Sequence, residues 1–289
     1  MSRLRKRAPH VVKVLGRRIS VALGERTAAA RLRPSFIMVG AQRCGTTSLY
    51  RALMAHPNIL PPVHHKGIYY FDVNYERGWS WYQGHFPLAA RARVQRRGAD
   101  KPITFEASGY YMYHPHASAR IVRDLPDVKV IAMLRDPVER AYSAYQHEFA
   151  RGFETETFER ALELEDERVE PEVATMLDDP TYQSFSHRHH SYRRRGLYAQ
   201  QLRPFLDGLG PENVVVVESS AFFARPVEEY ARIVDLLGLP AFVPAKFDRY
   251  NARPRSPMAE GTRTELEKEF APHDEALARL LGQPPGWRR

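Results

Sequence analysis

Residues 37–53, IMVGAQRCGTTSLYRAL, have the residue types and spacing best suited to bind a phosphate group. Gly40 and Gly45 bracket a short loop between an apolar run and a segment with helical character. This order resembles a P-loop, in which backbone N–H groups and a helix N-terminus surround a phosphate. Thr46 stands where a nucleotide triphosphatase carries its lysine, and the nearby cation, Arg43, lies inside the loop. The loop therefore predicts an anion site that is not built for a magnesium–triphosphate.

A second anion site is predicted within residues 128–147, VKVIAMLRDPVERAYSAYQH. The segment begins with a β-branched apolar run typical of a buried parallel strand, and Arg135 follows at the carboxyl end of that run. An Asp-Pro pair then favours the start of a helix, which carries a polar stripe made of Arg140, Ser143 and His147. Because the carboxyl ends of parallel strands share one edge of a sheet, Arg135 and Ser143 are expected beside the first loop.

Alternating strands and helices must position these two sites. The patterns predict strands near 36–40, 103–107, 128–134 and 213–218, and helices near 46–56, 115–124, 137–151, 154–172, 196–206, 226–237 and 262–270. This alternation predicts an α/β fold with a P-loop-like parallel sheet flanked by helices. A chain of 289 residues can bury one full core, so we expect a basic arm over residues 1–34 and a single domain over 35–289.

The first loop and the string R-D-P-x-x-R-A-Y-S-x-Y together resemble the sulfotransferases that use 3′-phosphoadenosine 5′-phosphosulfate (PAPS). The resemblance is to their bacterial and heparan-type carbohydrate branch in particular, and it extends from about Pro34 to the C-terminus. It implies the sulfotransferase fold. It also implies transfer of a sulfuryl group from PAPS, without a metal, to a hydroxyl or amine of a carbohydrate, glycolipid or small metabolite.

The resemblance also implies how the donor is bound. The first loop corresponds to the segment that holds the 5′-phosphosulfate in the family, here Arg43, Cys44, Gly45, Thr46, Thr47 and Ser48. Arg135 and Ser143 correspond to ligands of the 3′-phosphate, and a basic loop with Arg253 and Arg255 corresponds to a cover over that phosphate. Sulfuryl transfer resembles phosphoryl transfer, in which the protein acts mainly by positioning and by stabilising charge. Arg43 is therefore expected to stabilise the leaving phosphate as a fixed cation.

The general base that removes the acceptor's proton has several candidates. Heparan-type relatives carry a glutamate in a K-E-x-H-F-F-D segment, but the corresponding residues 66–72 read KGIYYFD and place Gly67 at that position. The candidates are His65, Asp72, Glu106 and His147. His147 corresponds to a histidine implicated in catalysis in N-sulfotransferases, and Asp72 corresponds to an aspartate of the acceptor site. Glu106 ends a strand that is expected to point into the cleft.

Charge and cysteine content indicate the setting in which the protein works. The whole formal net charge of +9 lies in residues 1–34, which contain ten Lys or Arg and one acidic residue. This arm is either a basic amphipathic helix in peripheral contact with an anionic membrane or an extension docked on the domain. The rest of the chain is neutral overall, so nucleic-acid binding is not expected. A single cysteine, Cys44, and no apolar run long enough to span a membrane predict a cytoplasmic protein.

Two other functions fit parts of the sequence. A P-loop kinase of a small molecule would need magnesium and ATP, and both Thr46 and Arg135 disfavour it. A non-catalytic protein that keeps the donor fold is favoured by Gly67, because the family's usual base is missing there. The run HRHH at 187–190 lacks the regular spacing and acidic partners of a zinc site, so no metal is expected.

Overall fold

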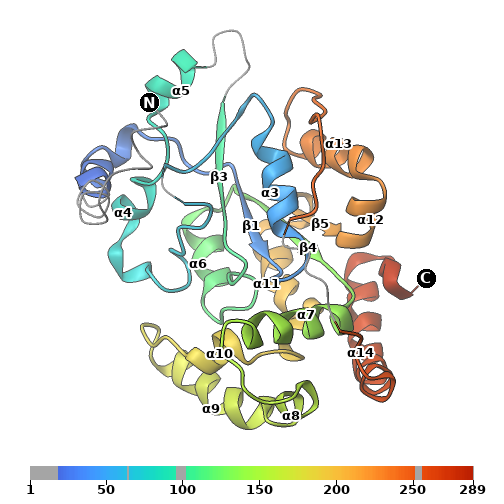
Figure 1. Cartoon of the computed structure of the whole chain (residues 1–289). Helices are drawn as coiled ribbons and strands as arrows, with labels where there is room; N and C mark the ends of the chain where they lie inside the picture. The colour runs from blue at the N-terminus through green and yellow to red at the C-terminus, as the bar shows by residue number, and fades with distance from the viewer. Residues whose placement is uncertain (1–18, 64, 96–101, 251–255, 289) are drawn as a thin grey trace.

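A five-stranded parallel sheet forms the centre of the molecule (Figure 1). The computed structural model describes residues 19–63, 65–95, 102–250 and 256–288. Within these residues the strands follow the order β2-β3-β1-β4-β5. They are β1 (Phe36–Gly40), β2 (Ile59–Leu60), β3 (Ile103–Ala107), β4 (Lys129–Leu134) and β5 (Val214–Glu218). The predicted parallel α/β fold is confirmed, and β2 is a short edge strand that the sequence patterns did not predict.

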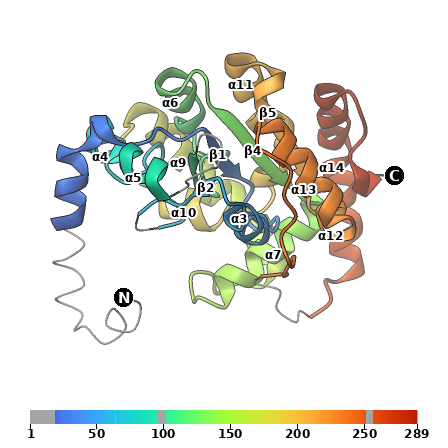
Figure 2. The same cartoon turned by 90° about the horizontal axis from the view of Figure 1, so that it is seen from above.

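The strands are apolar on both faces because helices cover both faces of the sheet. All five residues of β1 are buried, as are the last five of β4. In Figure 2, α6 (Ala117–Asp124) and α11 (Tyr198–Leu209) lie on one side of the sheet, and α3 (Thr46–Met54) and α13 (Pro226–Leu236) lie on the other. One continuous apolar core therefore holds the strands and fixes the edge at which they end.

The position of β1 in the sheet creates the crevice where a ligand can bind. β1 pairs with β3 on one side and with β4 on the other, and both pairings are parallel. The strand order thus runs in opposite directions from β1, and such a reversal opens a crevice at the carboxyl ends of the strands. The loop before α3 and the start of α7 (Pro137–Phe149) both lie at this edge.

The remaining helices surround this framework (Figure 1). They are α4 (Trp79–Gln83), α5 (Ala89–Gln95), α8 (Phe158–Glu163), α9 (Glu165–Asp178), α10 (Phe185–His189), α12 (Ser219–Ala224) and α14 (Glu260–Leu281). The acidic stretch 154–172 is helical as predicted only from Phe158 onward, where it divides between α8 and α9. α14 is much longer than the predicted 262–270. No helix in the described part of the chain combines the length and the apolar character that a bilayer crossing requires.

The described end of the basic arm packs on the domain. Arg31 donates a hydrogen bond from its guanidinium to the carbonyl of Phe86, and the N–H of Leu32 donates to the carbonyl of Pro87. The backbone of Gly24 lies so close to Gly84 that a Cβ on Gly24 would be 2.4 Å from the Gly84 carbonyl oxygen. Residues 1–18 lie outside the described residues, so the alternatives for that part of the arm stay as predictions.

Candidate active site

The loop between β1 and α3 has the backbone that a phosphate cradle needs. Gly45 precedes α3 with a φ of +91°, a left-handed conformation that glycine adopts without steric cost. A Cβ on Gly45 would lie 2.9 Å from the ring of Phe223, so packing also requires glycine there. Arg43 has a φ of +71°, which is strained for a residue with a side chain and is typical of functional loops. α3 begins at Thr46, so the N–H groups at its N-terminus lie beside the loop.

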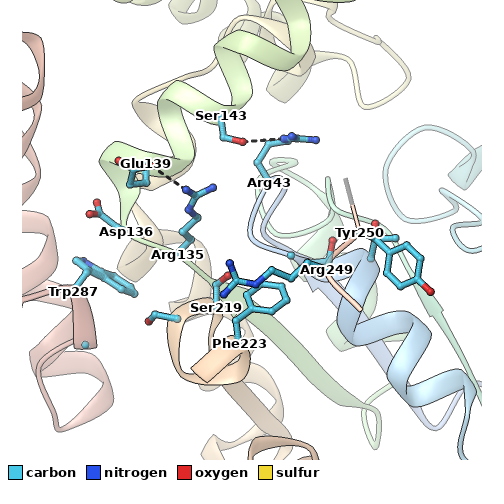
Figure 3. Close-up of a pocket in the computed structure, with 15 residues that line it drawn as sticks. Arg43, Arg135, Asp136, Glu139, Ser143, Ser219, Phe223, Arg249, Tyr250 and Trp287 are labelled. Atoms are coloured by element: carbon cyan, nitrogen blue, oxygen red, sulfur yellow. Dashed lines mark hydrogen bonds and ion pairs between the residues drawn. The ribbon is translucent and has the colours of Figure 1, made fainter. Parts of the chain in front are cut away.

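A cavity of about 510 Å³ lies over this loop (Figure 3). This volume is within the range of small-molecule binding sites. Both predicted anion sites contribute to its wall, through Arg43, Gly45, Thr46, Thr47, Arg135 and Ser143. The prediction that Arg135 and Ser143 lie beside the first loop is therefore confirmed.

A direct hydrogen bond joins the two sites. Arg43 Nε donates to Ser143 Oγ at 3.2 Å, although the residues are 100 positions apart in the sequence. Figure 3 shows the Arg43 guanidinium reaching from the loop to the serine on α7. This bond places a fixed positive charge between the phosphate loop and the helix.

An ion-pair network orients the second arginine of the cavity. Arg135 Nη2 lies 2.9 Å from Glu139 Oε2, and Arg263 Nη2 lies 2.6 Å from Glu139 Oε1. These pairs are partly exposed, so each contributes little to stability, but the bridging carboxylate fixes the direction of the Arg135 side chain. The predicted helix cap is also present, because Asp136 Oδ1 accepts the N–H of Val138 at 2.9 Å. Burial raises the pKa of Asp136.

The rest of the cavity wall comes from residues that sequence reasoning missed. They are Ser219, Ser220, Phe223, Arg249, Tyr250, Gly286 and Trp287. The guanidinium of Arg249 covers the ring of Phe223, with 4.5 Å between the guanidinium carbon and the ring centroid. The N–H of Tyr250 donates to Ser48 Oγ at 3.0 Å. Among these residues only Ser219 had a sequence signal. It directly follows the predicted strand near 213–218, and residues after a strand end are expected at this edge of the sheet.

Two of the predicted donor ligands, Cys44 and Ser48, do not line the cavity. Cys44 is completely buried, with its Sγ 3.8 Å from the hydroxyl of Tyr198, and burial raises the pKa of the thiol to about 11. Ser48 is buried and its hydroxyl holds Tyr250. Only their backbone can face the loop interior, because both side chains are used in packing. Arg253 and Arg255 lie outside the described residues.

Comparisons with known proteins agree with this geometry. Residues 33–253 match the family model described as "Sulfotransferase domain". A sulfotransferase structure from Alicyclobacillus acidocaldarius is 31% identical, covers 89% of this chain and 99% of that chain, and superposes with a TM-score of 0.67. The chain belongs to the sulfotransferase domain family.

Curated relatives of this sulfotransferase-family chain include two types of mammalian protein. Human bifunctional heparan sulfate N-deacetylase/N-sulfotransferase 3 is 26% identical over 292 residues, which cover 89% of this chain and 31% of that protein. Mouse heparan sulfate glucosamine 3-O-sulfotransferase 6 is 26% identical over 288 residues, which cover 88% of this chain and 73% of that protein. The chain thus spans less than a third of the bifunctional relatives. The fold described above is the sulfotransferase fold.

Glu106, a candidate base, does not point into the cleft as expected. Its side chain is completely buried, and its two carboxylate oxygens accept the N–H of Ile68 at 2.9 Å and the hydroxyl of Tyr111 at 3.1 Å. Burial raises the pKa of Glu106 to about 7. The carboxyl group therefore fastens the 66–72 segment to β3 in this family member.

Asp72, the second carboxylate candidate, is also buried. Asp72 Oδ2 accepts the hydroxyl of Ser108 at 3.2 Å, and Oδ1 accepts the N–H of Val73 at 2.7 Å. Burial raises its pKa to about 6. None of the four candidate bases lines the cavity over the phosphate loop.

Packing explains why glycine occupies position 67. A Cβ on Gly67 would lie 2.8 Å from the carbonyl oxygen of Ala107 and 3.1 Å from the ring of Tyr69. Tyr69 itself has a φ of +57°, an unusual conformation for a tyrosine. The segment is therefore remodelled around Gly67, and a glutamate side chain does not fit there.

The histidine candidates lie at different places. His147 is half-buried on α7, four residues after Ser143, so the two share one face of the helix. His65 is exposed in the loop before Lys66. Arg140, the first member of the predicted stripe, is instead completely buried and donates from Nη2 to the carbonyl of Tyr192. The stripe is thus a pair, Ser143 and His147.

Lys66 is a further residue that the sequence analysis did not single out as a site residue. Its Nζ lies 3.4 Å from Thr47 Oγ1 and 5.3 Å from the centre of the Tyr50 ring. Burial, together with the nearby Arg51, lowers the pKa of Lys66 to about 8. A lysine ammonium therefore reaches the phosphate loop from the β3 side, opposite the side of Arg135.

The histidine run at 187–190 is not arranged for a metal. His187 Nδ1 pairs with the hydroxyl of Tyr110, His189 Nδ1 with Glu148 Oε2, and His190 Nε2 with the carbonyl of Phe153. These partners direct the three imidazoles to different elements. Across the described ranges, no cluster of three or more His, Cys, Asp or Glu side chains could hold a metal ion.

Proposed function

We propose that this protein transfers a sulfuryl group from PAPS to a hydroxyl or amine. The observation that carries the proposal is the single cavity in which Arg43 of the phosphate loop bonds Ser143, beside Arg135 at the end of β4. Two clusters of anion-binding groups in one cavity suit a ligand with phosphate groups at two ends. PAPS has this form, with a 5′-phosphosulfate and a 3′-phosphate.

Each end of the donor has a set of residues to bind it. The loop N–H groups at Gly45, Thr46 and Thr47, with the two threonine hydroxyls, would hold the 5′-phosphosulfate. Arg135 and Ser143 would hold the 3′-phosphate, and Arg253 and Arg255 would cover it. Arg263 supports Arg135 through Glu139. Ser48 and Cys44 support the loop by packing.

Two cations would stabilise charge during transfer. As the bond from sulfur to the leaving phosphate oxygen breaks, negative charge grows on that phosphate. Arg43 would bind this oxygen as a permanent cation that cannot give up its proton. Lys66, beside Thr47, would contact the sulfuryl group from the side on which an acceptor can approach.

The proton of the acceptor also requires a base. Among the four candidates, we propose His147, because it shares a helix face with Ser143, the partner of Arg43. Glu106 and Asp72 are buried and hydrogen-bonded, so they would shape the acceptor side through the 66–72 segment. The heparan-type relatives support a carbohydrate as the acceptor.

The proposal also includes the cellular location of the protein and its contact with a membrane. The buried thiol of Cys44 is compatible with a reducing cytoplasm. Exposed Ile19 and Leu23, next to the basic residues of the arm, would support peripheral contact with an anionic membrane. Nucleic acid is not a proposed partner.

Two measurements test the proposed function. Titration calorimetry with adenosine 3′,5′-bisphosphate and with ATP–magnesium separates a PAPS site from a kinase site, and we expect binding of the bisphosphate only. Transfer of labelled sulfate from PAPS into a cell extract then tests turnover and identifies the acceptor. Tight binding of ATP–magnesium without binding of the bisphosphate would contradict the proposal. Donor binding without any labelled product would favour a non-catalytic protein.

A further inference from the structure

The last turn of the chain forms one wall of the donor cavity. Gly286 and Trp287 line the cavity together with the phosphate loop (Figure 3). They belong to a short 3₁₀ turn, η5 (Gly286–Arg288), which follows α14. The family match ends at residue 253, so this wall comes from outside the matched region.

The turn is held in place by polar contacts on both sides of the tryptophan. The N–H of Gly286 donates to both carboxylate oxygens of Glu218, at 3.0 and 2.9 Å, and Glu218 is the last residue of β5. Arg288 Nε donates to Asp274 Oδ2 on α14, and its Nη2 donates to the carbonyl of Glu267. The Trp287 ring packs edge-on against Tyr198, with 6.1 Å between ring centroids. The indole is thus positioned by the fold.

The wall of the cavity combines charged and aromatic groups. Arg43 and Arg135 provide cations beside the phosphate loop, Arg249 adds a third cation, and Asp136 and Glu139 add two carboxylates. Trp287 provides an aromatic ring, and Ser219 and Ser220 provide two hydroxyls. In the view of Figure 3, Arg135 lies between Arg43 and Trp287. The other ring of this wall, Phe223, is already covered by Arg249. An indole in a wall that also carries cations suits a nucleotide, with its phosphates at Arg43 and Arg135 and its base on Trp287.

We infer that Trp287 stacks on the adenine of the donor and that the C-terminal turn is therefore part of the donor site. The inference depends on the proposed function, because it assigns a binding position to one part of the proposed donor. Every base presents a flat π-face, and stacking on an aromatic side chain contributes about 1–3 kcal/mol, or roughly 5- to 150-fold in affinity. Adjacent serine hydroxyls can bond the polar edge of the base.

The test compares Trp287→Ala with Trp79→Ala, a matched control. Trp79 is partly buried like Trp287 but lies on α4, away from the cavity. Titration calorimetry with adenosine 3′,5′-bisphosphate should show binding about 10- to 100-fold weaker for W287A and unchanged for W79A. Trp287→Phe keeps a ring and should stay within a few-fold of the wild type. Ribose 5-phosphate, which lacks a base, should bind W287A and the wild type equally.

The outcomes separate this inference from the proposed function. If the wild type does not bind the bisphosphate, the proposed function fails. If the wild type binds it and W287A binds equally well, the function stands and the stacking inference is wrong. Equal weakening for ribose 5-phosphate would show that the substitution disturbs the whole cavity, which also contradicts a role specific to the base.

Fluorescence supplies a second measurement that does not need the alanine variant to fold. The chain has three tryptophans, and Trp79→Phe leaves Trp81, on α4, and Trp287 as emitters. Saturating adenosine 3′,5′-bisphosphate should quench the emission of the W79F protein through contact with Trp287. Binding by calorimetry without any change in emission would overturn the inference.

Discussion

The hydrogen bond between Arg43 and Ser143 joins a residue of the phosphate loop to a residue of α7. Each of these side chains has a proposed role at a different end of PAPS. The two residues should therefore have different effects when they are substituted.

Arg43→Ala should reduce kcat by about 100- to 1000-fold, with a much smaller change in donor affinity. This range is typical when one group that stabilises developing charge is removed. Steady-state kinetics with PAPS and calorimetry with the bisphosphate measure the two effects. Arg43→Lys keeps the cation and serves as the control. A loss of affinity with unchanged kcat would contradict a role in the transition state.

Ser143→Ala and Arg135→Ala should weaken binding of adenosine 3′,5′-bisphosphate much more than binding of adenosine 5′-phosphate. The expected loss is about 10-fold for the serine and more for the arginine, because hydrogen bonds to a charged group contribute about 1.5–3 kcal/mol. Calorimetry with both nucleotides measures the difference. Equal losses for the two nucleotides would show that these residues do not contact the 3′-phosphate.

Lys66→Met should lower kcat/KM by at least 10-fold, and Lys66→Arg should retain most of the activity, if the ammonium acts as a charge on the sulfuryl group. The pKa of Lys66 is lowered to about 8, so the side chain is charged at pH 7 and loses its charge as the pH rises through that value. The wild-type kcat/KM should therefore fall above about pH 8. K66R should not show this fall, since arginine stays charged. An inactive K66R protein would indicate that the lysine must lose its proton instead.

At the scale of elements, the 66–72 segment is held to β3 by the carboxyl group of Glu106 and by a backbone bond from the N–H of Ala107 to the carbonyl of Lys66. These contacts place Lys66 against Thr47 on α3. The buried carboxyl group of Glu106 thus supports the site by holding the backbone of the 66–72 segment. The protonation of Glu106 should therefore change the free energy of unfolding.

The free energy of unfolding should decrease as the pH rises from about 5 to about 8, and Glu106→Gln should reduce this dependence. The pKa of Glu106 is about 7 in the folded protein and about 4.3 for an ordinary glutamate, so the folded state retains a proton that the unfolded chain has released. The unfolded state then binds fewer protons, and stability is lost as pH increases through the folded pKa. The effect is on the order of 3 kcal/mol over the full range. Urea unfolding at pH 5, 6, 7 and 8 measures it.

An unchanged pH dependence in E106Q would show that the proton resides elsewhere. Asp72→Asn is the appropriate comparison, because burial also raises the pKa of Asp72, to about 6, and its contribution has the same sign. Both variants keep the side-chain volume, so a general loss of packing is not expected.

Elements with strong local patterns could be predicted from the sequence, and elements that depend on distant contacts could not. β1 and β4 are continuous apolar runs between helices, so their type and their parallel pairing followed from the pattern alone. β2 has two residues and exists because it pairs with β3, which no local pattern shows. Glu106 at the end of β3 was placed correctly on its strand, but the burial of its side chain depends on the 66–72 segment lying over it.

At the scale of the whole molecule, the two anion sites could be predicted because each combines a strand end with a helix start. The part of the wall formed by Arg249, Tyr250 and Trp287 could not be predicted, because these residues reach the cavity only through the path of the chain after α13. No spacing rule relates Trp287 to Gly45. The packing of the arm could not be predicted either, because its described end contacts residues 84–87, which are far away in the sequence.

The place of η5 also has a practical consequence for anyone who handles the protein. Gly286 and Trp287 line the cavity, and Arg288 follows them directly. A purification tag or a fused reporter placed after residue 289 would be attached two positions beyond Trp287, next to a wall of the proposed donor site. An affinity handle attached before the basic arm keeps this wall unchanged.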